Sequence, residues 1–187
     1  MMPRCHTPLP EEALLDYWIH ATPENEVAAI EEHLFSCDEC SARLAAMSSL
    51  GAGLSAVVRR GHFEGVVSRS LLNRIQRDGV QVRFYSLSPG ERVPCAAFPG
   101  DDLLVLALRA DLSGSESVTL SLTNVDDTVV GQAADIPVGR GDGEILWGVP
   151  GDAVRRMPSS RLRLKLSSSA PDTTVLAEYE LEHTSLG

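Results

Sequence analysis

The pattern of apolar and polar residues divides the chain into two parts. Through the first 79 residues, apolar side chains recur every three or four positions, which is the period of a helix with one buried face. This spacing predicts helices over residues 11–20, from Pro23 past Leu34, over 41–60 and over 63–78. The first part is therefore expected to be a bundle of three to four helices.

Capping residues support two of these boundaries. Thr22 is a preferred N-cap residue, Pro23 suits the first helical position, and acidic residues follow it. The dipeptide Asp78-Gly79 is a turn signal that ends the fourth helix. Gly51 and Gly53 are expected to weaken the third helix near its middle.

After Gly79 the apolar period shortens towards two, which is the period of a strand with one buried face. Residues Arg161 to Leu166 alternate basic and leucine side chains in this way. Strands are predicted over 80–85, 93–98, 103–110, 118–123, 129–136, 144–149, 161–166 and 174–182, with a single helical turn over 152–157. Short strands at this spacing favour an antiparallel sandwich or barrel. We therefore expect an α+β protein with a helical domain over residues 1–79 and a β-sandwich domain over 80–187.

Composition places the chain among globular proteins. It has 187 residues, of which 43% are hydrophobic and 22% charged, and this balance excludes wholesale disorder. No uninterrupted apolar run approaches the ~20 residues that cross a bilayer. The first ten residues lack the apolar core of a secretory signal. The expected location is the cytoplasm, without a membrane partner.

The formal net charge of −10 disfavours direct nucleic-acid binding, because an acidic surface repels phosphate backbones. Lys165 is the only lysine. An acidic surface suits a basic protein partner, although acidity also serves solubility alone. The sequence leaves the oligomeric state open.

The segment His33-Leu34-Phe35-Ser36-Cys37-Asp38-Glu39-Cys40 carries the clearest chemistry. On a helix, His33 and Cys37 lie one turn apart on the same face. Cys37 and Cys40 have the C-x2-C spacing of structural zinc sites, in which zinc takes four nitrogen or sulfur ligands. Cys5 and His6, just before the first helix, are both candidates for the fourth ligand.

Two other kinds of chemistry suit a C-x2-C pair less well here. A redox dithiol is typical of a βαβ context, which this region lacks. A catalytic zinc keeps an open position for water, whereas Cys5 or His6 would close this site. No nucleophile elbow, P-loop or dinucleotide motif is present in the sequence. We therefore expect a zinc-binding protein that is not an enzyme.

The segment LLDYW…TPENEVAAIEEHLFSCDECSARL resembles the zinc-binding anti-sigma factor family. In that family a Cys or His precedes a tyrosine-containing helix, a Ser/Thr-Pro-Glu cap follows, and H-x3-C-x2-C ends the second helix. The resemblance covers about residues 5–60. It implies that the helices hold an extracytoplasmic-function sigma factor and block its access to RNA polymerase.

The resemblance leaves two points open. The spacing from the first ligand to Tyr17 is longer here than the family pattern, so Cys5 and His6 remain alternatives. The second half of the chain lacks the clustered His and Glu residues of a cupin metal site, so its role is not implied. The leading hypothesis is a cytoplasmic anti-sigma factor that binds Zn2+. The alternatives are a zinc-stabilised interaction scaffold without sigma binding and, less favoured, a thiol oxidoreductase that uses Cys37 and Cys40.

The remaining notable residues predict structural roles. Trp18 and Trp147 are expected to anchor the cores, and Cys95 to be a buried residue in a strand. Asp101 is expected in a solvated turn. His183, near the end of the chain, has no evident partner in the sequence.

Overall fold

The computed structural model describes residues 5–139, 143–169 and 173–186. The chain divides into two compact units, each built from two stretches of sequence. The helical unit comprises Met1–Val57 and Ser68–Val80, and the strand unit comprises Val58–Val67 and Gln81–Gly187. A single cut at residue 79 would separate 58–67 from the unit in which it packs.

The helical unit contains α1 (Glu11–Ile19), α2 (Glu24–Ser36), most of α3 (Asp38–Arg59), and α4 (Arg69–Arg77). Both α1 and α2 follow a proline and carry acidic residues in their first turn, which favours the positive end of the helix dipole. The predicted cap at Thr22 is wrong. Pro23 precedes the first helical residue, no side chain caps α2, and the Thr22 hydroxyl is buried without a hydrogen-bond partner.

Helix α3 begins at Asp38, three residues before the predicted start at Ser41, and runs without interruption past Gly51 and Gly53. Gly51 is buried against the indole of Trp18, and any Cβ at this position would overlap that ring. Gly53 has open space around it. The first glycine is therefore a packing requirement, whereas the second is not.

The predicted helix over 63–78 is wrong in its first half. Gly61 and Gly65 have φ angles of 69° and 157°, which do not continue a helix. Instead β1 (Gly65–Val66) pairs with β7, and Ser68 then caps α4 by accepting a hydrogen bond from Leu71 N. In α4 itself, Leu72 and Ile75 are buried.

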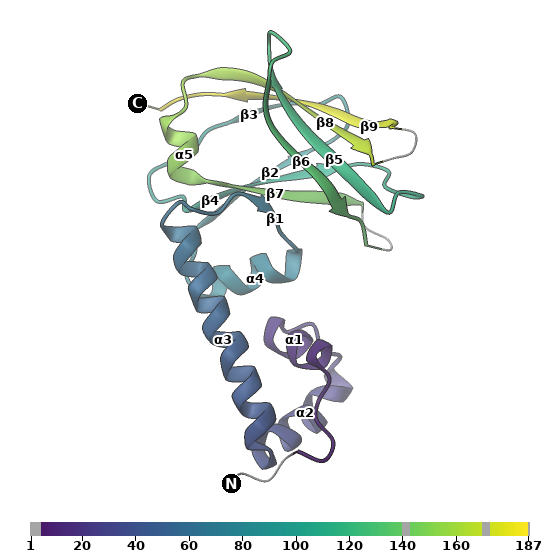
Figure 1. Ribbon diagram of the computed structural model, residues 1–187. Helices are drawn as coiled ribbons and strands as arrows, with labels where there is room; N and C mark the ends of the chain where they lie inside the picture. Colours follow the sequence, from purple (N-terminus) through teal and green to yellow (C-terminus); the bar gives the residue numbers. More distant parts are fainter. Residues whose placement is uncertain (1–4, 140–142, 170–172, 187) are drawn as a thin grey trace. The chain divides into compact units, whose positions relative to one another are not determined.

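The strand unit contains two sheets (Figure 1). Its strands are β1, β2 (Val82–Leu87), β3 (Arg92–Cys95), β4 (Leu103–Arg109), β5 (Ser117–Asn124), β6 (Val129–Pro137), β7 (Glu144–Pro150), β8 (Ser160–Ser168) and β9 (Val175–His183). Their orders are β1-β7-β4-β2 and β3-β9-β8-β5-β6. The expectation of wholly antiparallel sheets is wrong, because β2 pairs parallel to β4 and β3 pairs parallel to β9. The chain leaves the first sheet after β2, adds β3 to the second, and returns at β4 in the direction of β2.

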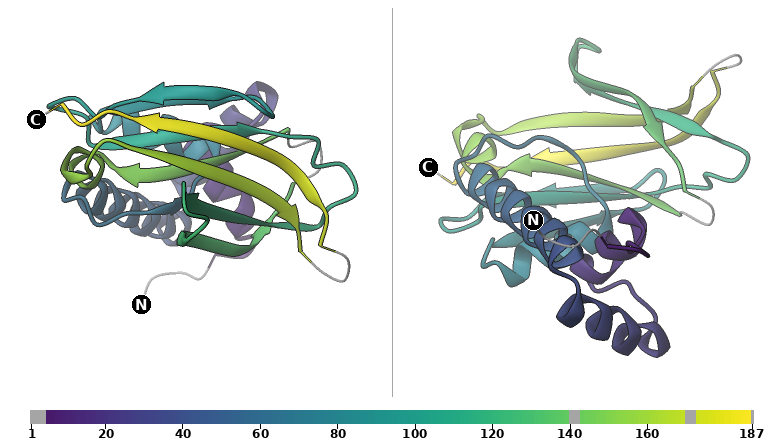
Figure 2. Two further views of the ribbon diagram at one scale, coloured as in Figure 1. Left: turned by 90° about the horizontal axis from the view of Figure 1, so that it is seen from above. Right: turned by 60° about the horizontal axis from the view of Figure 1, so that its bottom comes forward.

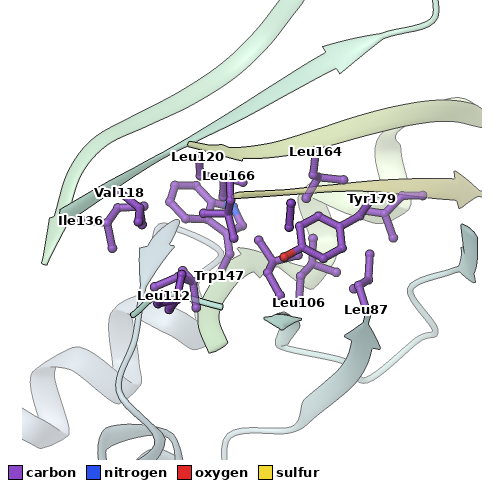
Figure 3. Close-up of a cluster of buried hydrophobic side chains, with 14 of the residues drawn as sticks. Leu87, Leu106, Leu112, Val118, Leu120, Ile136, Trp147, Leu164, Leu166 and Tyr179 are labelled. Atoms are coloured by element: carbon purple, nitrogen blue, oxygen red, sulfur yellow. The ribbon is translucent and has the colours of Figure 1, made fainter. Parts of the chain in front are cut away.

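One apolar cluster draws side chains from both sheets (Figure 3). Leu106 and Trp147 come from the four-stranded sheet, and Leu120, Leu164 and Tyr179 from the five-stranded one. The buried Tyr179 hydroxyl donates a hydrogen bond to the Arg109 carbonyl at 2.7 Å, so its polar atom is satisfied. The sheets lie on opposite sides of this cluster (Figure 3), and the ribbon views of Figure 2 show the two sheets as separate layers.

The described residues form five helices, and four of them, α1–α4, lie wholly or mostly in the helical unit, where three to four were expected. The fifth, α5 (Gly151–Arg156), lies between β7 and β8, where the sequence predicted a single turn. The observed fold class is α+β, with helices followed by two mixed sheets.

Among the described residues, α3 is long and apolar enough, by length and composition alone, to cross a membrane. Only 17% of its most apolar 18 residues is buried. Arg43 and several serines lie within α3, so the helix is not an uninterrupted apolar run of the kind that the sequence was expected to lack. Long helices of proteins that do not enter membranes can have the same length and apolar composition.

Candidate metal centre

Four potential metal ligands meet in the helical unit. Sγ of Cys5, Cys37 and Cys40 and a ring nitrogen of His33 all lie within 4.8 Å of one another. Cys5 precedes α1, His33 is in the last turn of α2, and Cys37 joins α2 to α3. Cys40 is in the first turn of α3 and is fully buried. The cluster thus ties the start of the chain to the α2–α3 junction.

The α2–α3 junction is shaped by local hydrogen bonds. Cys37 is extended, with φ −128° and ψ 100°, so it turns the chain out of α2. Its carbonyl accepts from Ser41 N at 3.1 Å, and the Ser41 hydroxyl donates to the Leu34 carbonyl at 2.6 Å. Carbonyls at the end of α2 would otherwise lack partners. This turn brings Cys37 and Cys40 to one point beside His33.

The segment before α1 is held against α3 by three hydrogen bonds. Cys5 N donates to the Glu39 carboxylate at 2.9 Å, and Leu9 N donates to Cys40 Sγ at 3.4 Å. An Arg43 guanidinium nitrogen donates to the Leu9 carbonyl at 2.8 Å. The second of these bonds is of the kind that supports a thiolate ligand from outside the coordination sphere. These contacts fix Cys5 on the cluster.

The contact between Cys5 and His33 has the length expected between two ligands of a tetrahedral zinc ion. Cys5 Sγ lies 3.6 Å from His33 Nε2. Zn–S bonds of about 2.3 Å and Zn–N bonds of about 2.0–2.1 Å place neighbouring S and N ligand atoms about 3.5 Å apart. Three thiols and one imidazole form a Cys3His set, which is a common structural zinc site.

The structure separates the two candidates for the fourth position. Cys5 is part of the cluster, whereas His6 is exposed and is not part of it. The other three predicted residues, His33, Cys37 and Cys40, are brought together as the spacing indicated.

The electrostatics of the cluster favour a bound cation. The backbone N–H of Cys40 donates to Cys37 and is the main reason that the pKa of the Cys37 thiol is lowered. Partial burial, followed by the hydrogen bond to Cys37, raises the pKa of the Cys5 thiol to about 11. Neighbouring thiols cannot all ionise without a compensating positive charge. A divalent ion would supply that charge and hold all the thiols as thiolates.

Other candidate residues have structural roles. Cys95 lies in β3 of the strand unit, and burial raises the pKa of its thiol to about 11.

The expected solvated turn at Asp101 is wrong for that side chain. Its carboxylate is largely buried and accepts from Arg83 Nε at 2.6 Å and from Phe98 N at 2.8 Å. Burial opposes ionisation of Asp101, but the Arg83 bonds outweigh it and lower its pKa. The sequence around Asp101 gives no indication that its side chain pairs with Arg83, which lies 18 residues earlier.

Comparisons with known proteins leave the family open. No family model and no curated protein matches the sequence. Among solved structures, the chain is similar to the N-terminal domain of phage TP901-1 ORF48, with 8% sequence identity and a TM-score of 0.34. That match covers 56% of this chain and 98% of the phage domain. A likeness this low carries no argument about function.

Proposed function

We propose that this protein is a cytoplasmic, zinc-binding anti-sigma factor that sequesters an extracytoplasmic-function sigma factor. The observation that carries the proposal is the Cys3His cluster. It brings Cys5 next to three ligands that follow it by 28 to 35 positions in the sequence. The anti-sigma family that the sequence resembles has the same H-x3-C-x2-C ligands and a Cys or His before its first helix, although the spacing from that first ligand to Tyr17 is longer here. The cluster supports the metal, and the resemblance supports the partner.

The role proposed for zinc is structural. Four protein ligands fill a tetrahedron and leave no position for water or substrate, which supports a non-enzymatic function. Residues Cys5, His33, Cys37 and Cys40 would hold the ion and fix the α2–α3 junction against the start of the chain. Reduced thiols of this kind persist in the cytoplasm, which supports the proposed location.

The surface of the helical unit suits a basic protein partner. Helices α1 and α2 together carry seven carboxylates and no lysine or arginine. Large apolar side chains are also exposed on this unit, with Phe35 92% and Leu50 77% accessible. Exposed apolar side chains, together with the carboxylates of α1 and α2, suit a surface that attracts and then binds a protein of opposite charge. For the strand unit, two mixed sheets that enclose one core support a β-sandwich that serves as an accessory module.

The experiment is an anaerobic purification of the full chain co-expressed with each extracytoplasmic-function sigma factor of its source. We expect stoichiometric zinc by metal analysis and retention of one sigma factor by affinity capture. Cys37→Ser should reduce both. Cys95→Ser, a matched change in the strand unit, should reduce neither.

Two outcomes favour the alternatives. Stoichiometric zinc with no sigma factor retained, and none inhibited in a transcription assay, would support a zinc-stabilised scaffold. Absence of zinc, combined with reversible Cys37–Cys40 disulfide turnover, would support a thiol oxidoreductase.

A further inference from the structure

The strand unit contains a pocket that the zinc site and the proposed partner do not use. It has a volume of about 220 Å³ and lies between the two sheets and α5. Its inner wall is aliphatic and includes Leu104, Leu106, Leu122 and Leu181. The exposed Glu64 and Val130 also line it and mark where it meets solvent. Protein interiors rarely leave spaces larger than a water molecule, so an apolar pocket of this size is a candidate ligand site.

One polar side chain in the pocket wall lacks a complete set of hydrogen bonds. His183 is only 3% exposed and ends β9. Its Nε2 lies 3.3 Å from the Met157 carbonyl, whereas its Nδ1 is buried without a partner. Buried polar atoms of native proteins are nearly always paired, so this nitrogen calls for a partner that the described residues do not supply.

The hydrogen bond at His183 Nε2 determines which kind of group can pair with Nδ1. A carbonyl can only accept, so Nε2 carries the proton that is shared with Met157. In a neutral imidazole, Nδ1 is then an acceptor. The missing group is therefore a hydrogen-bond donor, such as a hydroxyl.

The size of the pocket limits the ligand. Apolar cavities of about 150 Å³ take up benzene, which has six heavy atoms, so a pocket of about 220 Å³ suits roughly nine. This is smaller than the usual drug-sized pocket of about 300–1,000 Å³. Nδ1 has almost no solvent contact, so a wall side chain must move to admit the hydroxyl. Met157 lines the pocket, and its unbranched side chain is suited to that movement.

We propose that the strand unit binds a small, neutral, apolar alcohol, with its hydrocarbon part in the pocket and its hydroxyl donating to His183 Nδ1. The aliphatic wall selects an uncharged apolar body, and the imidazole selects a donor over an ether or an ester. This site is independent of the zinc cluster, so either assignment can fail without the other.

The test uses the full zinc-loaded chain and three probes of matched size. 1-Octanol has nine non-hydrogen atoms and a donor, 1-methoxyheptane has the same number and no donor, and octanoate is charged. We expect saturable 1:1 binding of 1-octanol by calorimetry, with both other probes at least about tenfold weaker. In protein labelled with ¹⁵N at histidine, 1-octanol should shift the Nδ1 resonance of His183.

Two variants and a control complete the design. His183→Phe should abolish the preference for 1-octanol over 1-methoxyheptane. Gly131→Val should weaken all probes, because its new side chain enters the pocket and its Cβ meets only Leu122, at 3.9 Å. His62→Phe changes an exposed histidine and should alter nothing. Absence of saturable binding, equal binding of 1-octanol and 1-methoxyheptane, or preference for octanoate would each overturn the proposal.

Discussion

Cys5 Sγ and His33 Nε2 lie 3.6 Å apart, although 28 residues separate them in the sequence. This contact closes the cluster, because the other ligands lie close to His33 along the chain. It also distinguishes two neighbouring residues, since Cys5 joins the cluster and the exposed His6 does not.

The first prediction concerns the identity of the fourth ligand. Cys5→Ser should lower the zinc affinity by more than about 100-fold, because loss of a ligand exceeds the 10–100-fold effect of losing an outer-shell contact. The thermal midpoint of the helical unit should fall with it, since metal binding and folding are coupled. His6→Ala should leave both unchanged. Competition with a chromophoric chelator measures the affinity, and equal losses in the two variants would contradict the assignment of Cys5.

The second prediction concerns pH. Zinc binds thiolates, so the thiol of Cys5, whose pKa is raised to about 11, must release its proton when the metal binds. The apparent zinc affinity should therefore rise with pH throughout the range from 6 to 8. The thiol of Cys37, whose pKa is lowered, should lose its proton first. Calorimetry in buffers of different ionisation enthalpy measures the number of protons released, and a value near zero at pH 7 would contradict thiolate ligation.

The third prediction compares two glycines of one helix. By helix propensity alone, glycine to alanine should stabilise α3 by about 1 kcal/mol at either position. Gly53→Ala should do so, because its new methyl group enters open space. Gly51→Ala should instead destabilise the protein by about 1–3 kcal/mol, because the methyl group would overlap the Trp18 ring. Chemical denaturation of both variants measures the difference, and a stabilising Gly51→Ala would show that Trp18 does not pack there.

The fourth prediction concerns Asp101 and acid stability. The carboxylate accepts two bonds from Arg83 and one from Phe98 N, and charge-assisted bonds contribute about 1.5–3 kcal/mol each when truncated. Asp101→Asn should therefore destabilise the strand unit by about 1–3 kcal/mol at pH 7.

The pKa of Asp101 is lower in the folded protein than its ordinary value of 3.8. Its contribution is thus fully present above the unfolded value and is lost as the pH falls through the folded one. The stability difference between wild type and Asp101→Asn should shrink below about pH 4. A difference that stays constant from pH 7 to pH 3 would contradict the role of the ionised group.

The fifth prediction concerns the exposed apolar residues of the helical unit. Phe35 is 92% accessible, so Phe35→Ser removes no internal packing and should change the free energy of unfolding by less than about 0.5 kcal/mol. If Phe35 anchors a partner, the same change should weaken sigma-factor binding by about tenfold or more. Surface plasmon resonance measures that loss. Val129→Ser, at a 58% accessible position in the strand unit, is the matched control and should leave binding unchanged.

The sequence predicted well what depends on local spacing. His33, Cys37 and Cys40 meet as their spacing in the sequence indicated, although Cys37 lies in the extended turn after α2 and not on the helix itself. Most strands were predicted from alternation, which needs only one buried face. The pairing of the strands was not predicted. The parallel pairs β2–β4 and β3–β9 depend on which sheet each strand joins, and contacts between residues far apart in the sequence determine this.

The errors share the same cause. Phe63 and Val67 keep helical spacing with Leu71, but β1 pairs with β7 about 80 residues later, and this non-local pairing outweighs the local pattern. His183 gave no signal in the sequence, because its burial and its contact with Met157 arise only when β9 has paired with its neighbours.

The two units of this chain are interleaved along the sequence. The chain leaves the helical unit after Val57, spends ten residues in the strand unit, and returns at Ser68 before leaving again after Val80. A gene fusion at a single breakpoint would therefore separate β1 from its partner β7, or separate α4 from the other helices of its unit. Because each unit is built from two stretches of sequence, exchanging either unit intact for another requires two crossovers and not one.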